Sequence, residues 1–340
     1  MSTSQAADFD FVIPLFRFRW NTRATLEGLT KHYDPQTIHI VAPAQTVQVV
    51  EQMMDNWAVA PVQLHEEDGF FERSTGLSRE MICSELVLGE GSLYTPGWFY
   101  QQLLKLGAPE GIPDLTEWYM VWDSDLLPVE TWPILVNDGD AIQHFFALLQ
   151  SNRTGNAKIV AQWAEWIHQV LGITPLLDDE GTLVPHHMWF RQKHLTAFKQ
   201  QLNQYFQSED HWLRLMMRSA NKFTTFAEYW SYSSWVGATA PNDLSYHPYA
   251  LYGETTERFF DDGTARFSLE LRKYLSMSED GTTFFAPSYA DVDAFIREVY
   301  GSDPLPSSLS FESSPRHLKK DPANMHIEET RSRWNPRNDF

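Results

Sequence analysis

Short apolar strands alternate with amphipathic helices from the start of the chain, and this alternation restricts the fold more than any other feature. FDFVIPLF (9–16) is an apolar run, and residues 22–32 follow it with the spacing of a helix. The β-branched run TIHIV (37–41) and a second helical pattern over 44–57 come next. Strand, helix, strand and helix with short connections predict a parallel, Rossmann-like α/β layer.

The remaining sequence extends this layer without repeating it. Further helices are predicted over 97–106, 158–171, 195–206 and 289–300, and the turn sequence NDGD (137–140) predicts a hairpin. There is no Gly-x-Gly-x-x-Gly after the first strand and no P-loop sequence anywhere. Because no repeat or linker divides the chain, we predict one elaborated domain over residues 1–301. A loosely ordered tail rich in Ser, Pro, Arg and Asn is predicted over 302–340.

The chain is strongly acidic, and this limits its partners. Its 340 residues include 45 acidic and 26 basic side chains, for a formal net charge of -19. Such a charge disfavours general binding to nucleic acid or to an anionic membrane, so no nucleic-acid partner is expected. A single cysteine, no signal sequence and no apolar run of membrane-spanning length predict a cytoplasmic protein without a transmembrane segment.

The strongest chemical signal is a pair of aspartates at the end of a predicted buried strand. EWYMVW (117–122) leads directly into Asp123, Ser124 and Asp125. Open α/β sheets bind ligands at the carboxyl ends of their strands, and two such carboxylates suit Mg²⁺ or Mn²⁺ bound to a diphosphate. A cation there would neutralise the charge that develops on a leaving nucleoside diphosphate. The alternative is an ordinary Asp-x-Asp turn or helix cap.

Several segments, in this order, resemble a known family. They are VIPLF near the start, GWFYQQLLKL (97–106), WYMVWDSDLLP (118–128), PHHMWF (185–190) and FAEYW (226–230). The series is similar to a family of predicted GT-A-type glycosyltransferases catalogued as a domain of unknown function, over roughly residues 9–260. The chain departs from the family's pattern at Ala227, where a small hydroxyl residue is usual. It also departs at Arg17 and Arg19, near where many GT-A enzymes carry an acidic residue.

The resemblance implies a general base and a third metal ligand. An acidic residue downstream of the metal motif points to Glu228 as the base for the acceptor hydroxyl, with aromatic neighbours that would raise its pKa. The alternative for Glu228 is a solvated or ion-paired glutamate. Many GT-A enzymes use a late histidine as a ligand, which points to His247 beside Pro248, although a structural hydrogen bond is the commoner role of such a residue.

Two further histidines compete with His247. His186 and His187 are consecutive, so on a strand they would face opposite sides and only one would reach the site easily. His187 belongs to the His-Met segment of the resembling family. We therefore expect His187 to make the catalytic contact.

Polar side chains near the first strand and on the 97–106 helix are candidates for the donor site. Lys105 suits phosphate and Gln101, one turn away, suits sugar or a carboxylate, while Gln102 beside it also needs a polar partner. If the first strand continued, Arg17 and Arg19 would face one side and suit a diphosphate. Ser124 lies between the two aspartates. The alternatives are an ordinary helix face and surface ion pairs.

Together these features predict a metal-dependent glycosyltransferase with a GT-A-like fold. It would use Mn²⁺ or Mg²⁺ to move a sugar from a nucleoside-diphosphate sugar to a hydroxyl of a glycan or small molecule. A metal-dependent hydrolase or nucleotidyltransferase is the first alternative, although such sites usually carry more bridging carboxylates. A non-catalytic carbohydrate-binding protein is the second.

Overall fold

The centre of the molecule is a five-stranded, mostly parallel sheet. The structure is a computed structural model that describes residues 8–86 and 95–312, except 133, 139–140, 150–156, 179, 224–225, 249–256, 260 and 278–284. The strand order is β3-β2-β1-β4-β8. The strands are β1 (Asp10–Pro14), β2 (Thr37–Ala42), β3 (Val62–Glu66), β4 (Trp118–Trp122) and β8 (His187–Arg191). All neighbours pair in parallel except β8, which runs antiparallel to β4.

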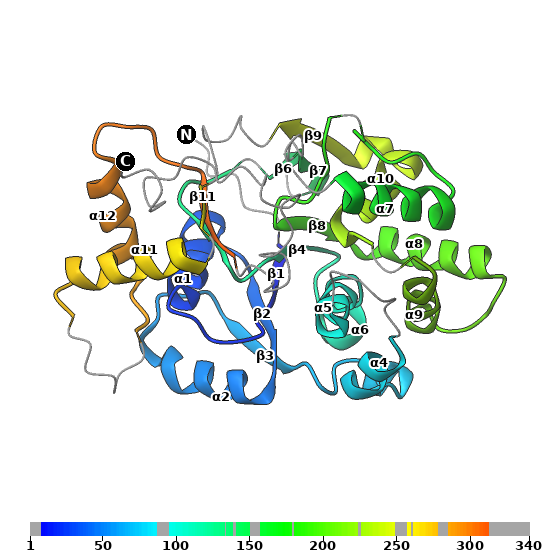
Figure 1. Cartoon of the computed structure of the whole chain (residues 1–340), viewed down its shortest axis with the longest axis horizontal. Coiled ribbons are helices and arrows are strands. Elements are labelled where there is room, and N and C mark those ends of the chain that lie inside the picture. Colours follow the sequence, from blue (N-terminus) through cyan, green and yellow to red (C-terminus); the bar gives the residue numbers. More distant parts are fainter. Residues whose placement is uncertain are drawn as a thin grey trace.

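Helices lie on both sides of this sheet (Figure 1). On the left of the view are α1 (Thr22–Tyr33), α2 (Ala44–Met53), α11 (Asp261–Tyr274) and α12 (Tyr289–Tyr300). On the right are α4 (Arg79–Glu85), α5 (Pro96–Leu106), α6 (Ala108–Gly111), α7 (Ala157–Trp166), α8 (Gln192–Phe206), α9 (Trp212–Phe223) and α10 (Glu228–Thr239). The predicted α/β class, a Rossmann-like mixed sheet flanked by helices, is confirmed.

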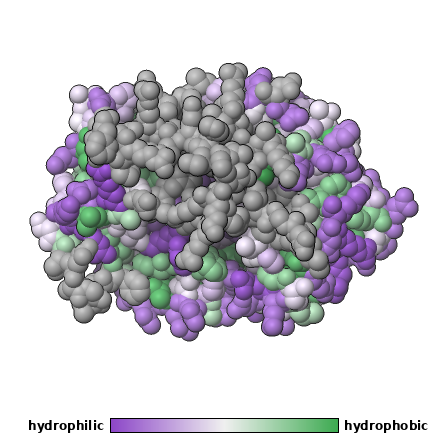
Figure 2. Space-filling view, in the orientation of Figure 1, coloured by the Kyte–Doolittle hydropathy of each residue, from purple (hydrophilic) through white to green (hydrophobic). Residues whose placement is uncertain are grey.

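The described residues also contain several short helical segments. These are the single turn α3 (Glu72–Thr75), 3₁₀ turns at Met54–Asn56 and Pro241–Asp243, and a π-helical continuation of α7 over Ile167–Leu171. In the ranges that the structure describes, no helix is both long and apolar enough to cross a membrane. Figure 2 shows hydrophilic residues over much of the coloured part of one face, in keeping with the acidic composition.

Two three-stranded sheets are added to the central one. The first contains β5 (Leu126–Pro128), β10 (Glu257–Phe259) and β11 (Ser308–Phe311), in the order β10-β11-β5. The second contains β6 (Leu135–Asp138), β7 (Ala141–Leu149) and β9 (Leu244–Pro248), in the order β6-β7-β9. The hairpin predicted from the NDGD turn is the antiparallel pair of β6 and β7.

Strand β11 lies within the segment predicted as a loosely ordered tail from residue 302. All four of its residues are buried, and it pairs antiparallel with β5 and parallel with β10. A second core of aromatic rings, which includes Phe259, Phe267 and Phe311, holds this strand in place. The tail prediction is therefore corrected for residues 308–311, because these residues bury apolar side chains. Residues 313–340 lie outside the described residues.

Both ends of helix α5 are fixed by local contacts. At the start, the Thr95 hydroxyl accepts a hydrogen bond from the Trp98 amide at 3.2 Å, and Pro96 occupies the first turn. At the end, a Cβ on Gly107 would lie 2.3 Å from Cε1 of the buried Phe71. The helix packs against β1 and α10, so its buried face lies beside the carboxyl end of the sheet.

Candidate metal centre

The Asp-Ser-Asp turn connects β4 to β5, and backbone hydrogen bonds from several elements fix it. The Asp123 amide donates to the His186 carbonyl at 2.9 Å, and the Phe311 amide donates to the Asp125 carbonyl at 2.8 Å. The Asn21 side chain donates to the Ser124 carbonyl at 3.2 Å. The turn therefore joins the central sheet, the small sheet and the start of α1. It presents both carboxylates at the carboxyl edge of the parallel strands.

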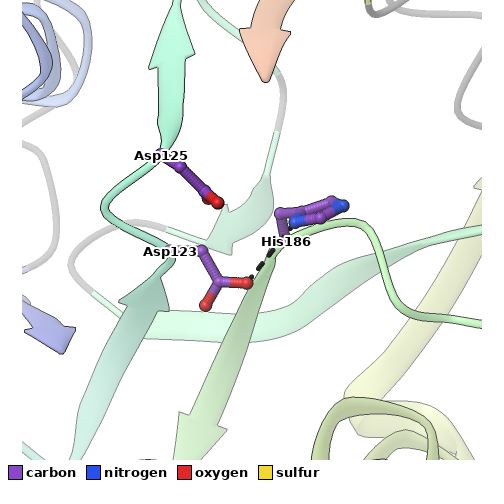
Figure 3. Close-up of side chains that lie close together, drawn as sticks. All are labelled: Asp123, Asp125 and His186. Carbon is purple, nitrogen blue, oxygen red and sulfur yellow. Dashed lines mark ion pairs between the residues drawn. The ribbon is translucent and has the colours of Figure 1, made fainter. Parts of the chain in front are cut away.

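The two aspartates meet a histidine at this edge (Figure 3). Ligand atoms of Asp123, Asp125 and His186 all lie within 4.8 Å of one another. His186 immediately precedes β8 and has a left-handed backbone with φ of 64°. Its Nδ1 lies 3.5 Å from Oδ2 of Asp123. The Asp-Ser-Asp turn and His186 are far apart in the sequence, and the fold brings them together.

Asp123 forms an ion pair with the buried side chain of Lys105. Nζ of Lys105 lies 2.7 Å from Oδ1 of Asp123 and 2.6 Å from Oε1 of Glu228. The Tyr229 hydroxyl donates to the same Asp123 oxygen at 2.8 Å. Burial alone would raise the pKa of Asp123, but the charges of Lys105 and His186 hold it well below its usual range. Asp123 is thus ionised in the folded protein.

The same contacts keep Lys105 charged. Burial alone would lower the pKa of Lys105, but Asp123 and Glu228 outweigh burial and raise it. The Lys105 ammonium also lies 4.3 Å from the centre of the Tyr229 ring, within the range of a cation–π contact. The group therefore contains a buried cation, Lys105, a buried carboxylate, Glu228, and a part-buried carboxylate, Asp123, so it retains a net negative charge.

Asp125 is surrounded differently. Its Oδ1 is buried and accepts no hydrogen bond from the residues that the structure describes. Burial raises the pKa of Asp125 to about 6; Asp123 and Glu312 add to this effect, while His186 and Arg19 oppose it. A divalent cation would supply the partner that this oxygen lacks. Carboxylate oxygens with one imidazole nitrogen fit Mn²⁺ or Mg²⁺, so the residues present suit the predicted cofactor.

Glu228 does not face the aspartates directly. It begins α10 and is buried, and its carboxylate binds Lys105. Its amide donates to Oε1 of Gln102 at 3.2 Å. Burial raises the pKa of Glu228, although Lys105 opposes this. The ion-paired role, which was the alternative in the sequence interpretation, is the one that the structure displays.

Two polar residues of α5, Lys105 and Gln102, have hydrogen-bond partners within the protein. Lys105 binds two carboxylates, so its charge is already matched within the protein. Gln102 is buried beside Glu228, and its Nε2 has no hydrogen-bond partner in the described part of the chain. Gln101 is only half-buried. Helix α5 thus contributes to the site through Lys105, which binds Asp123.

The three candidate histidines occupy different environments. His187 is 2% exposed, and its ring centre lies 5.0 Å from that of Trp122 and 4.8 Å from that of Trp132. Burial lowers the pKa of His187 to about 3. His247 lies in β9 with its ring edge-on to Phe146, 4.6 Å between centres. The structure therefore places His186 with the aspartates, in the ligand position that the sequence interpretation gave to His247.

The two arginines after β1 diverge because the chain turns instead of continuing as a strand. Arg17 is exposed. Arg19 is half-buried, and its Nη1 donates to the Phe311 carbonyl at 3.0 Å. Since the charge of Arg19 also acts on Asp125, only this arginine joins the site.

Glu312 is a site residue that the sequence interpretation missed. Its Oε1 lies 3.5 Å from Nε2 of His186, and its amide donates to the Phe259 carbonyl at 2.8 Å. No local signal pointed to it, because its position depends on the pairing of β11 with a strand far earlier in the sequence. His186 was visible in the His-His pair, but its left-handed backbone was not.

Fold and site together define a class: an α/β protein with an Asp-Asp-His group at the carboxyl edge of a mostly parallel sheet. The chain belongs to the family of unknown function DUF6492, which matches residues 22–260. No curated protein matches the chain.

Several solved structures are similar to the chain. Mouse xyloside xylosyltransferase 1 in its apo form has a TM-score of 0.43 at 9% identity, covering 89% of this chain and 97% of that one. An active-site mutant of LgtC has a TM-score of 0.41 at 12% identity, covering 94% and 95%. The glycosyltransferase GlyE of Streptococcus pneumoniae TIGR4 has a TM-score of 0.39 at 9% identity, covering 96% and 61%. Because all three TM-scores are below 0.5, the fold assignment rests on the strand order and register given above.

Proposed function

We propose that this protein is a metal-dependent glycosyltransferase that moves a sugar from a nucleoside-diphosphate sugar to a hydroxyl acceptor. One observation carries the proposal: the ligand atoms of Asp123, Asp125 and His186 lie within 4.8 Å of one another, and a buried oxygen of Asp125 has no hydrogen-bond partner among the residues that the structure describes. The group lies at the carboxyl edge of the sheet, where open α/β folds bind nucleotides.

In this proposal Asp123, Asp125 and His186 hold Mn²⁺ or Mg²⁺. When bound, the cation neutralises negative charge on the leaving nucleoside diphosphate. The ion pair with Lys105 keeps Asp123 ionised and fixes its orientation. Glu228 acts as a positioning residue because it binds Lys105. Arg19, whose charge acts on Asp125, supplies a positive charge suited to a phosphate group.

The test compares ligand binding by the full chain with and without metal. Thermal stability is measured with UDP-, GDP-, CMP- and dTDP-sugars, each with and without Mn²⁺, for the wild type and for Asp125→Asn. We expect a rise in the melting temperature that requires both Mn²⁺ and one nucleotide class, and that Asp125→Asn abolishes.

Other outcomes would identify the alternatives. Rapid release of nucleoside diphosphate or nucleoside monophosphate without any acceptor would indicate a hydrolase. A shift with oligosaccharides that needs neither metal nor nucleotide would indicate a carbohydrate-binding protein. Wild-type protein that binds Mn²⁺ but no nucleotide sugar would contradict the proposal.

A further inference from the structure

Glu312 lies beside the metal centre although it is far from the aspartates in the sequence. Glu312 directly follows β11, and backbone hydrogen bonds fix the end of this strand. The Phe311 amide donates to the Asp125 carbonyl, and the Glu312 amide donates to the Phe259 carbonyl, each at 2.8 Å. The segment that positions Glu312 is therefore the one that supports the backbone of Asp125.

The carboxylate of Glu312 faces the ring of His186 and is only partly exposed to solvent. Its side chain is 20% exposed, and its Oε1 lies 3.5 Å from Nε2 of His186. The Ser310 hydroxyl donates to the same oxygen at 3.1 Å, which restricts the carboxylate's orientation. On the other side of the ring, Nδ1 of His186 lies 3.5 Å from Oδ2 of Asp123. Each ring nitrogen thus faces a different carboxylate.

This arrangement suits a cation on Nδ1, the nitrogen that faces Asp123. A neutral imidazole carries one proton, so a cation that takes the lone pair of Nδ1 requires the proton to be on Nε2. The Glu312 carboxylate lies beside Nε2 and would accept that proton as a hydrogen bond. Histidine ligands generally donate their other N–H to a carboxylate or carbonyl, which fixes the ring and its tautomer.

The geometry points to Glu312 as a positioning residue that orients His186 for binding a divalent cation. This inference rests on the metal centre of the proposed function but not on sugar transfer. Glu312 acts through the ring of His186, so its effect on metal affinity depends on that ring being present.

The test is a double-mutant cycle on Mn²⁺ affinity, measured by titration calorimetry on the full chain without nucleotide. Glu312→Ala should weaken Mn²⁺ binding by about 10–100-fold, the range found when such partners are lost. In a His186→Ala background the same substitution should change the affinity by less than about threefold. Glu312→Gln keeps the shape of the side chain and should weaken binding less than Glu312→Ala.

Controls separate this effect from misfolding and from loss of charge. Glu270→Ala removes an exposed glutamate of α11 that pairs with Lys273 and should leave the affinity unchanged. The melting temperature of each metal-free variant shows whether it folds, and Glu312→Gln serves as the measurable variant if the alanine form unfolds.

Three results would overturn the inference. An equal loss of affinity in both backgrounds would make Glu312 a direct ligand or a general source of negative charge. No loss in either background would remove it from the metal centre while leaving the proposed function intact. Wild-type protein that binds no Mn²⁺ would overturn this inference and the metal-dependent proposal together.

Discussion

The two aspartates of one short turn are stabilised in opposite ways. Asp123 already has a cation, because Lys105 and the Tyr229 hydroxyl bind its Oδ1 below the turn. The backbone of Asp125 accepts a hydrogen bond from β11, and its buried side-chain Oδ1 has no partner among the described residues. The difference indicates that Asp123 is pre-oriented by the protein, whereas Asp125 needs an external cation to remain ionised at low cost.

The largest expected effect comes from removing the cation beneath Asp123. Lys105→Met would leave the buried Glu228 and the part-buried Asp123 without their cation, so the free energy of unfolding should fall by about 3–5 kcal/mol. Urea denaturation of the metal-free protein measures this change. Adding Glu228→Gln should restore part of the loss, because one of the two carboxylate charges is then removed.

A matched control tests whether burial causes this effect. Lys31→Met removes a lysine with a half-exposed side chain, 3.5 Å from Asp293, and should cost about 1 kcal/mol or less. If Lys105→Met were no more costly than Lys31→Met, Asp123 would not depend on its buried cation.

The next effect concerns the other aspartate. Asp125→Asn should weaken Mn²⁺ binding by more than the roughly 100-fold upper range typical of outer-shell partners, because it removes a ligand. The metal-free melting temperature should stay the same or rise, since burying an amide costs less than burying a charge. Calorimetry and a thermal melt measure the two quantities.

Asp123→Asn provides the contrast. It should lower the metal-free melting temperature, because Lys105 loses one of its two acidic partners. Equal melting temperatures for the two asparagine variants would mean that the two aspartates are not stabilised differently.

A smaller effect distinguishes the histidines. His186→Ala should weaken Mn²⁺ binding by about 100-fold, at the upper end of the range for outer-shell partners and at least as much as Glu312→Ala, because the ligand itself is lost. His247→Ala should leave the affinity unchanged, because His247 lies in β9 against Phe146. A weakening on His247→Ala but not on His186→Ala would restore the original sequence assignment. Both affinities are measured by the same titration.

Local sequence patterns predicted several helices and strands, among them the strand that leads into the aspartates. The helix predicted over 289–300 matches α12, which begins at a capping box formed by Ser288 and Asp291. The apolar run 118–122 is β4 and ends at Asp123, so the position of the Asp-Ser-Asp turn followed from sequence. Periodicity and caps act within a few residues of one another, which is why these predictions succeeded.

The partners of the aspartates depend on contacts between distant segments, and the sequence did not predict them. The ion pair of Lys105 with Glu228 requires α5 to pack against α10. Glu312 reaches His186 only because β11 pairs with β5. The choice of His186 over His187 depends on a left-handed backbone at His186, which neighbouring residues do not encode.

The smallest effect tests whether Lys105 alone is enough to hold Asp123. Tyr229→Phe removes one hydrogen bond to Asp123 and should cost about 1 kcal/mol of stability, while Mn²⁺ affinity changes by no more than about threefold. Tyr232→Phe is the matched control in the same helix, because the Tyr232 hydroxyl accepts from the Arg191 amide instead. Similar stability losses with unchanged metal affinity would show that Lys105 sets the position of Asp123. A tenfold loss of affinity confined to Tyr229→Phe would transfer that role to the tyrosine, since Lys105 is intact in both variants.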